Sequence, residues 1–263
     1  MILLAVGDIV GNPGRKIVKE LLPKIRKDYN VDIVIANGEN SAGGFGITYI
    51  TAQELYSYGV DVITMGNHVW SKKEIMSFID EDTRIIRPAN LPDELPGTGS
   101  TIVELFNHKV AVINLIGRIF MEPADSPFNS ALKEIEKFKN EADIIIVDFH
   151  AEATSEKLAM GWFLDGKANV VFGTHTHVQT ADERILPNGT GYITDLGMTG
   201  PYNSIIGVEK DIIVKKFVTQ LPEKFEIAKG EAQFNAVVFE IDDKSKQVVS
   251  IKRIFELRKL KDN

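Results

Sequence analysis

Short apolar runs that end in a glycine or a polar side chain recur along this chain, and they constrain its fold more than any other feature. An apolar run of this length indicates a buried strand. In an open α/β sheet, ligands bind at the carboxyl ends of the strands. Five runs end in polar groups, at Gly7-Asp8, Asn37-Gly38-Glu39-Asn40, Gly66-Asn67-His68, Asp148-Phe149-His150 and Gly173-Thr174-His175-Thr176-His177. The pattern predicts an α/β fold that delivers carboxylate, amide and imidazole groups to one rim.

The segments around these runs predict an alternation of strands and helices over the first 80 residues, with a β-rich C-terminal third. We expect strands at 2–6, 31–36, 60–65, 101–106, 110–115, 144–149, 170–173, 191–194, 233–241 and 247–254. We expect helices at 13–27, 48–58, 71–79, about 130–140 and around 153–164. Ser71 is a suitable N-cap for the third helix. A hairpin through Asn107-His108 would join the two strands near residue 107.

Composition and length exclude several classes of protein. With no repeat and no Gly/Ser linker, the 263 residues predict one domain, 1–263. The formal charge of -7 argues against an extended nucleic-acid surface, but a local cation could still hold a small phosphate ligand. The absence of cysteine excludes disulfides, thiolate zinc sites and a cysteine nucleophile. The basic stretch from Lys252 to Lys261 is interpreted as a solvated end.

The sequence also predicts where in the cell the protein is located. The apolar start has no basic n-region and reaches Asp8 quickly, so a signal peptide is not expected. No run approaches the roughly 20 apolar residues of a membrane span. We therefore expect a cytoplasmic protein without a membrane segment.

Each polar strand end has a structural explanation when it is taken alone. An aspartate such as Asp8 after a strand is more often a turn former or helix cap. A lone histidine such as His150 is more often a satisfied buried group, and His108 in the predicted turn is interpreted as structural. The pair His175 and His177 is harder to explain, because two imidazoles fill a core poorly. Since the structural explanations would have to hold independently at five strand ends, the set predicts a metal site.

The number of ligands indicates two ions. Seven side chains are candidates: Asp8, Glu39, Asn40, Asn67, His150, His175 and His177. A single tetrahedral ion takes four ligands, so seven suit two ions that share a bridging group. Glu39 is a natural bridge because a carboxylate has two oxygens. Oxygen and imidazole donors suit iron and manganese alike, so ligand type does not separate these metals.

The order of these motifs resembles the calcineurin-like metallophosphoesterases over residues 7–177, and Gly-x-His-x-His is its most specific part. Two departures from the usual motifs of that superfamily narrow the resemblance to one of its branches. Val10 stands where that superfamily usually has a histidine, and Glu39-Asn40 stands where most members have an aspartate. Both fit the bacterial YmdB-like branch, to which the whole length is similar, including Asn37-Gly38-Glu39-Asn40-Ser41-Ala42-Gly43-Gly44 and Asp195-Leu196-Gly197-Met198-Thr199-Gly200.

The resemblance implies a four-layer α/β/β/α sandwich and a phosphodiesterase that acts on 2′,3′-cyclic nucleotides of the cyclic AMP type. It implies two irons, with manganese as a substitute in vitro. Carried over by residue, the first ion would be held by Asp8, Glu39, Asn40 and His177. The second ion would be held by Glu39, Asn67, His150 and His175. His68 would be the proton donor.

The assigned ligands and proton donor suit phosphodiester hydrolysis, but two other functions are also compatible with the sequence. Two ions about 3.5–4 Å apart can hold a hydroxide and clamp a phosphoryl group for in-line attack. If Asn67 takes the coordination position, His68 is free to protonate the leaving alkoxide. One alternative is a metal-holding regulator that binds a nucleotide or protein partner with little turnover. Another is a phosphomonoesterase, for which Arg118 is the basic candidate. The β-rich edges permit a homo-oligomer without requiring one.

Overall fold

Alternate residues of strand β1 (Ile2–Val6) face two different apolar cores in the computed structural model, which describes residues 1–105 and 107–260. Leu4 and Val6 pack under helices on one side, and Leu3 and Ala5 pack against a second sheet on the other. Successive side chains of a strand point to opposite faces. A strand that is buried on both faces is therefore apolar throughout, as this one is.

The first sheet has eight strands in the order β2-β12-β13-β1-β3-β4-β5, with β14 paired to β13. Besides β1, they are β2 (Asp8–Ile9), β3 (Ile33–Asn37), β4 (Val62–Thr64), β5 (Ile85–Ile86), β12 (Met198–Pro201), β13 (Glu231–Ile241) and β14 (Val248–Lys259). Strands β1, β3, β4 and β5 are parallel, whereas β13 runs antiparallel to β1 and β14. The carboxyl ends of the parallel strands therefore share one edge of this sheet.

The second sheet has six strands in the order β10-β11-β9-β8-β7-β6. They are β6 (Ser100–Leu105), β7 (His108–Ile116), β8 (Ile144–His150), β9 (Val170–Thr174), β10 (Arg184–Ile185) and β11 (Gly191–Ile193). Strands β7, β8, β9 and β11 are parallel, and β6 forms the predicted hairpin with β7.

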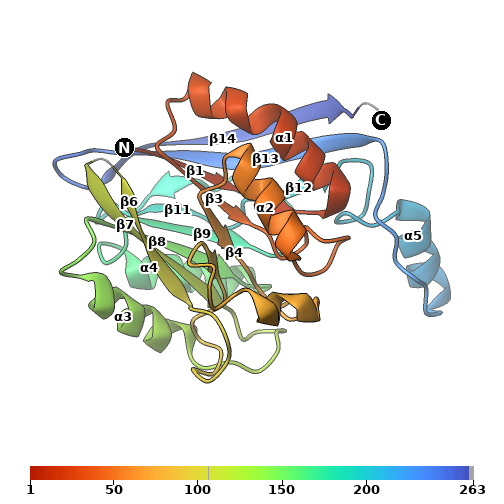
Figure 1. Cartoon of the computed structure of the whole chain (residues 1–263), viewed down its shortest axis with the longest axis horizontal. Coiled ribbons are helices and arrows are strands. Elements are labelled where there is room, and N and C mark those ends of the chain that lie inside the picture. The colour runs from red at the N-terminus through yellow and green to blue at the C-terminus, as the bar shows by residue number, and fades with distance from the viewer. Residues whose placement is uncertain (106, 261–263) are drawn as a thin grey trace.

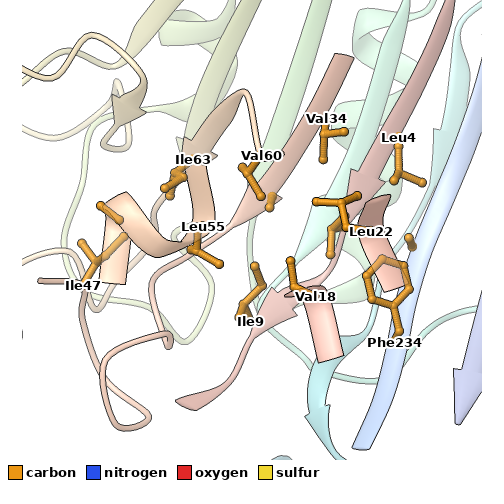
Figure 2. Packing of buried hydrophobic residues seen from close by; sticks show 14 of the residues in the cluster. Leu4, Ile9, Val18, Leu22, Val34, Ile47, Leu55, Val60, Ile63 and Phe234 are labelled. Atoms are coloured by element: carbon orange, nitrogen blue, oxygen red, sulfur yellow. The ribbon is translucent and has the colours of Figure 1, made fainter. Parts of the chain in front are cut away.

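Helices cover the outer faces of both sheets (Figure 1). Helices α1 (Gly11–Asp28) and α2 (Tyr49–Tyr58) lie on the first sheet, and α3 (Pro127–Phe138) and α4 (Thr154–Leu164) lie on the second. Figure 2 shows Leu22 of α1 beside Leu4 of β1, and Val18 of α1 beside Ile9 of β2. Three apolar cores thus separate four layers, which confirms the predicted α/β/β/α sandwich.

Several local predictions were wrong. Residues 71–79 contain only a 3₁₀-helix, η1 (Lys73–Ser77), and Ser71 does not cap it; its hydroxyl lies 3.3 Å from Nδ1 of His68 instead. Helix α5 (Lys210–Thr219) was not expected, and it projects beyond the layers at the right of Figure 1.

The basic stretch near the C-terminus is a strand rather than a loose end. Up to Lys259 it belongs to β14, an edge strand that pairs with β13 along its length. Lys252, Arg253 and Lys259 are exposed as predicted, which is common on edge strands. Phe106 and Lys261, which were parts of predicted segments, lie outside the described residues. Within the described ranges, no helix is long and apolar enough to cross a membrane.

Candidate metal centre

The predicted site residues lie where the carboxyl ends of parallel strands from both sheets meet. Asp8 follows β1, Glu39 follows β3 and Asn67 follows β4 in the first sheet. His150 ends β8 and His175 follows β9 in the second. The expectation of one rim was therefore too simple, because each sheet of the sandwich supplies part of the site.

Nε2 of His150 is the centre of a group of four ligand-type atoms. It lies 2.9 Å from Oδ1 of Asn67, 3.1 Å from Oε1 of Glu39 and 3.1 Å from Nδ1 of His175. Adjacent ligands of an ion bound at about 2.0–2.1 Å lie about 3 Å apart. The four atoms therefore have the spacing of a metal-ligand set. Among the described residues, Glu39, His150 and His175 form a cluster of side chains that could hold a metal ion.

Gly66 leaves room for this group. A Cβ on Gly66 would lie 2.3 Å from Nε2 of His150 and 2.5 Å from Oε2 of Glu39. Any other residue at this position would fill the space in which these two side chains converge. Glycine before Asn67 therefore has a steric explanation.

Acceptor oxygens lie at the outer ring nitrogens of two imidazoles. Nε2 of His175 lies 3.0 Å from Oε2 of Glu152, which is an ion-pair distance. Nδ1 of His177 donates to the carbonyl oxygen of Ile206 at 2.9 Å, because a carbonyl oxygen only accepts. In a neutral ring of His177 the other nitrogen then carries a lone pair, which is the arrangement found in histidine ligands of metals.

The residues expected around the other ion are arranged more loosely. Nε2 of His177 lies 3.8 Å from Oδ1 of Asp8. The amide nitrogen of Asn40 donates to the carbonyl oxygen of Gly44 at 2.9 Å, but its buried Oδ1 has no hydrogen-bond partner among the described residues. Buried acceptors are normally satisfied, so this oxygen fits a position beside a cation.

Burial disfavours charge throughout the centre. It raises the pKa of the Asp8 and Glu39 carboxyls above their ordinary values. It lowers the pKa of His150 to about 3 and that of His175 to about 4. Desolvated carboxylates beside neutral imidazoles are stabilised by a bound cation, which prefers both forms as ligands. The donor set therefore fits the implied metal ions.

His68 lies beside this group and borders a cavity of about 390 Å³. Its backbone N–H donates to Oε2 of Glu39 at 2.9 Å. Its ring packs edge-on against Phe45, with the centroids 4.9 Å apart. The side chain thus faces the cavity, whereas the preceding Asn67 turns its amide oxygen toward His150.

A buried ion pair behind the histidine turn was missed from the sequence. His175 and His177 have positive φ angles of 100° and 65°, which are strained for residues other than glycine. Between them, Thr176 donates its hydroxyl to Oδ2 of Asp195 at 2.7 Å. The same oxygen accepts from Nζ of Lys157 at 2.6 Å. This pair holds the turn in place.

Asp148 and Thr174 form a second buried polar group that was missed. Burial raises the pKa of Asp148 to about 8, although hydrogen bonds from Thr64 and Thr174 lower it. The signal was available in the sequence, because an aspartate inside the apolar run 144–149 requires a polar partner. Glu152 gave no such signal, since an acidic residue in a loop is ordinary.

The two sheets with this centre at their carboxyl ends define the class as a metallophosphoesterase. The solved structure of a novel phosphatase from Mycoplasma pneumoniae superposes with a TM-score of 0.93 and 37% identity, covering 98% of this chain and 94% of that one. A hypothetical protein from Thermus thermophilus gives a TM-score of 0.92 and 40% identity, covering 98% and 99%.

Sequence comparison identifies the family. The model of the YmdB-like protein family matches residues 4–254. A 2′,3′-cyclic-nucleotide 2′-phosphodiesterase of Bacillus subtilis is 52% identical, covering 97% of this chain and 96% of its own length. The chain belongs to the YmdB-like family. The prediction of an enzyme of the phosphodiesterase class is confirmed at this level.

Proposed function

We propose that the chain hydrolyses 2′,3′-cyclic nucleotides at a centre of two metal ions. The observation that carries this proposal is the group of four ligand-type atoms around Nε2 of His150, 2.9–3.1 Å from it, beside a cavity bordered by His68. The name of the Bacillus subtilis relative supports the choice of substrate.

In this proposal Glu39 would be a ligand shared by the two ions. Asp8, Asn40 and His177 would complete the first set, and Asn67, His150 and His175 would complete the second. Iron is the proposed metal, with manganese as its substitute. When bound, two such ions supply an activated water and neutralise charge on the phosphoryl oxygens.

His68 is the proposed general acid. It borders the cavity without belonging to the ligand group around His150. Imidazole has the unperturbed pKa nearest to neutrality among side chains, which suits a proton donor. Its proton would pass to the ester oxygen that leaves phosphorus when the cyclic ester opens.

The cavity walls suit a nucleoside. The residues that line the cavity include the apolar side chains of Phe45, Ile206, Val208, Phe225 and Ile227. Aromatic side chains in such a wall can stack on a base. Among the described residues that line the cavity, none is a lysine or arginine. Since a dianionic monoester would gain from such cations, the lining favours a singly charged diester, and Arg118 is not part of it.

The test combines elemental analysis with a substrate panel. Freshly purified protein should contain close to two metal ions per chain and should hydrolyse 2′,3′-cyclic AMP faster than 3′,5′-cyclic AMP or p-nitrophenyl phosphate. Metal-replete protein without turnover on any of these would indicate the regulator. A preference for p-nitrophenyl phosphate over bis-p-nitrophenyl phosphate would indicate a phosphomonoesterase.

A further inference from the structure

We propose that a second cavity beside the metal centre holds one further nucleotide of a short RNA whose 3′ end is a 2′,3′-cyclic phosphate. The proposal rests on the proposed function and names the substrate class of the same site. The second cavity has a volume of about 510 Å³, compared with about 390 Å³ for the cavity that His68 borders. His177 and Ile206 line both cavities. A nucleotide chain whose last residue lies in the first cavity can therefore continue into the second.

The second cavity lies on the face of the first sheet that also lines the core between the two sheets. That core reaches Val237 of β13 and Ile251 of β14. Alternate side chains of a strand share a face, so Gln233 lies on the face of Val237. For the same reason Arg253 and Phe255 lie on the face of Ile251, and all three side chains line the second cavity. Polar and aromatic groups thus replace the apolar core where this face opens beside the metal centre.

Two exposed aromatic rings in the second cavity offer a stacking surface. Phe255 is 51% exposed and Tyr202 is 43% exposed, and their ring centroids lie 6.2 Å apart. Aromatic side chains of this kind stack on the bases of single-stranded nucleic acids with little regard to sequence. A base that covers these rings would also remove their apolar surface from water. The rings therefore suit a base next to the one in the first cavity.

A guanidinium borders the same cavity. Nε of Arg253 lies 2.8 Å from Oε2 of Glu183, and the arginine side chain is 37% exposed. A guanidinium has five N–H donors, and this ion pair engages the one on Nε. The remaining donors have the planar geometry that binds phosphate oxygens. Arg253 therefore suits the phosphate that links two nucleotides, a group that 2′,3′-cyclic AMP lacks.

The chemistry of the two cavities limits the ligand to a short RNA. A 2′,3′-cyclic ester requires the 2′-hydroxyl of ribose, so a DNA chain cannot carry one. Arg253 contributes one positive charge to a chain with a formal charge of -7. That balance suits one linking phosphate better than the many phosphates of a long nucleic acid. The proposal is therefore compatible with the expected lack of an extended nucleic-acid surface.

Kinetics on two substrates test the subsite. The first substrate is 2′,3′-cyclic AMP, and the second is the dinucleotide adenylyl-(3′→5′)-adenosine 2′,3′-cyclic phosphate, each with Mn²⁺-loaded enzyme. We expect KM to be about 10-fold lower for the dinucleotide, because one further base is stacked. Equal KM values would overturn the subsite and leave the proposed hydrolysis standing.

Matched variants test which side chains form the subsite. Phe255→Leu removes the ring and keeps an apolar side chain, so the KM advantage of the dinucleotide should fall to within about 3-fold, whereas Phe255→Trp should keep it. Arg253→Gln should also reduce the advantage. Arg258→Gln is its control, because Arg258 lies on the opposite face of β14 and lines neither cavity. Thermal melting confirms that each variant is folded. An advantage that survives both Phe255→Leu and Arg253→Gln would overturn the assignment.

A binding measurement separates the subsite from the proposed hydrolysis. Adenylyl-(3′→5′)-adenosine has no cyclic phosphate, so its dissociation constant, measured by NMR titration, reports binding without turnover. We expect the constant to rise by about 10-fold in Phe255→Leu and to change little in Phe255→Trp. Absent binding, or equal binding by wild type and Phe255→Leu, would overturn the subsite. If the dinucleotide binds as expected but neither cyclic substrate is hydrolysed, the subsite stands and the proposed function is overturned.

Discussion

Asn67 and His68 are neighbours in the chain but face different surroundings. The amide oxygen of Asn67 lies 2.9 Å from Nε2 of His150, whereas the ring of His68 packs edge-on against Phe45 at the cavity. In the proposed centre, Asn67 as a ligand and His68 as the acid would therefore not compete for one ion.

Replacement of His68 by alanine tests this division. We expect kcat to fall by about 10²–10⁴-fold, the usual contribution of general acid catalysis, with the metal content unchanged. Asn67→Ala is the matched variant and should lose metal. Elemental analysis and steady-state kinetics on 2′,3′-cyclic AMP measure both effects. Loss of metal from His68→Ala would show that His68 is a ligand instead.

The apolar side chains that line the cavity should contribute to substrate binding and therefore to KM. Phe225 lines the cavity, whereas Phe217 on α5 lies outside it and is 77% exposed. Stacking of a base on an aromatic ring contributes about 1–3 kcal/mol. Phe225→Ala should therefore raise KM for 2′,3′-cyclic AMP by about 10-fold or more, and Phe217→Ala should not. Equal KM values for the two variants would remove Phe225 from the base site.

Much of the fold and of the site could be predicted because the polar residues of the site directly follow apolar strands in the sequence. The apolar runs of β1, β3, β4, β8 and β9 marked strands, and parallel strands bring their carboxyl ends together. Bounds were less accurate: the run predicted to start at Val31 begins as a strand at Ile33. The segment before it is occupied by the turn that follows α1.

The remainder depends on contacts between distant segments. Helix α5 is an exception, because Ile213, Val214, Phe217 and Val218 do have helical spacing in the sequence although only Ile213 is buried. The hydrogen bonds of Thr174 to Asp148 and of Thr176 to Asp195 join residues 26 and 19 positions apart. A single sequence identifies such residues as polar but does not say which of them pair.

The pair of Lys157 and Asp195 should be essential for stability. The two side chains are 1% and 0% exposed, with Nζ 2.6 Å from Oδ2. Removal of one partner leaves an uncompensated buried charge, which costs about 3–5 kcal/mol. Lys157→Met should lower the free energy of unfolding in urea by this amount. Lys133→Met breaks an exposed pair with Asp93 and should change little. Comparable losses in both variants would contradict the argument.

The carboxylate of Asp182 should make stability depend on pH. Burial alone would raise its pKa, but hydrogen bonds from Thr180 and Thr194 outweigh burial and lower it below the ordinary value. A carboxyl whose folded pKa is depressed stabilises the protein above its unfolded pKa of about 3.9, and this contribution is lost as pH falls through the folded pKa. In urea unfolding, the stability difference between wild type and Asp182→Asn should be larger at pH 6 than at pH 3. A difference that stays constant would contradict the role of ionisation.

Gly66 should be required for the metal centre more than for the fold. Its added Cβ would come within 2.3 Å of Nε2 of His150, so Gly66→Ala must push His150 or Glu39 out of the ligand group. We expect loss of most bound metal and activity. Gly43→Ala is the control, because its φ of 73° strains an alanine while nothing lies within 4 Å of the added atom. Elemental analysis and thermal melting distinguish the effects: Gly43→Ala should lose some stability and keep its metal. Full metal content in Gly66→Ala would show that the ligand group does not occupy this space.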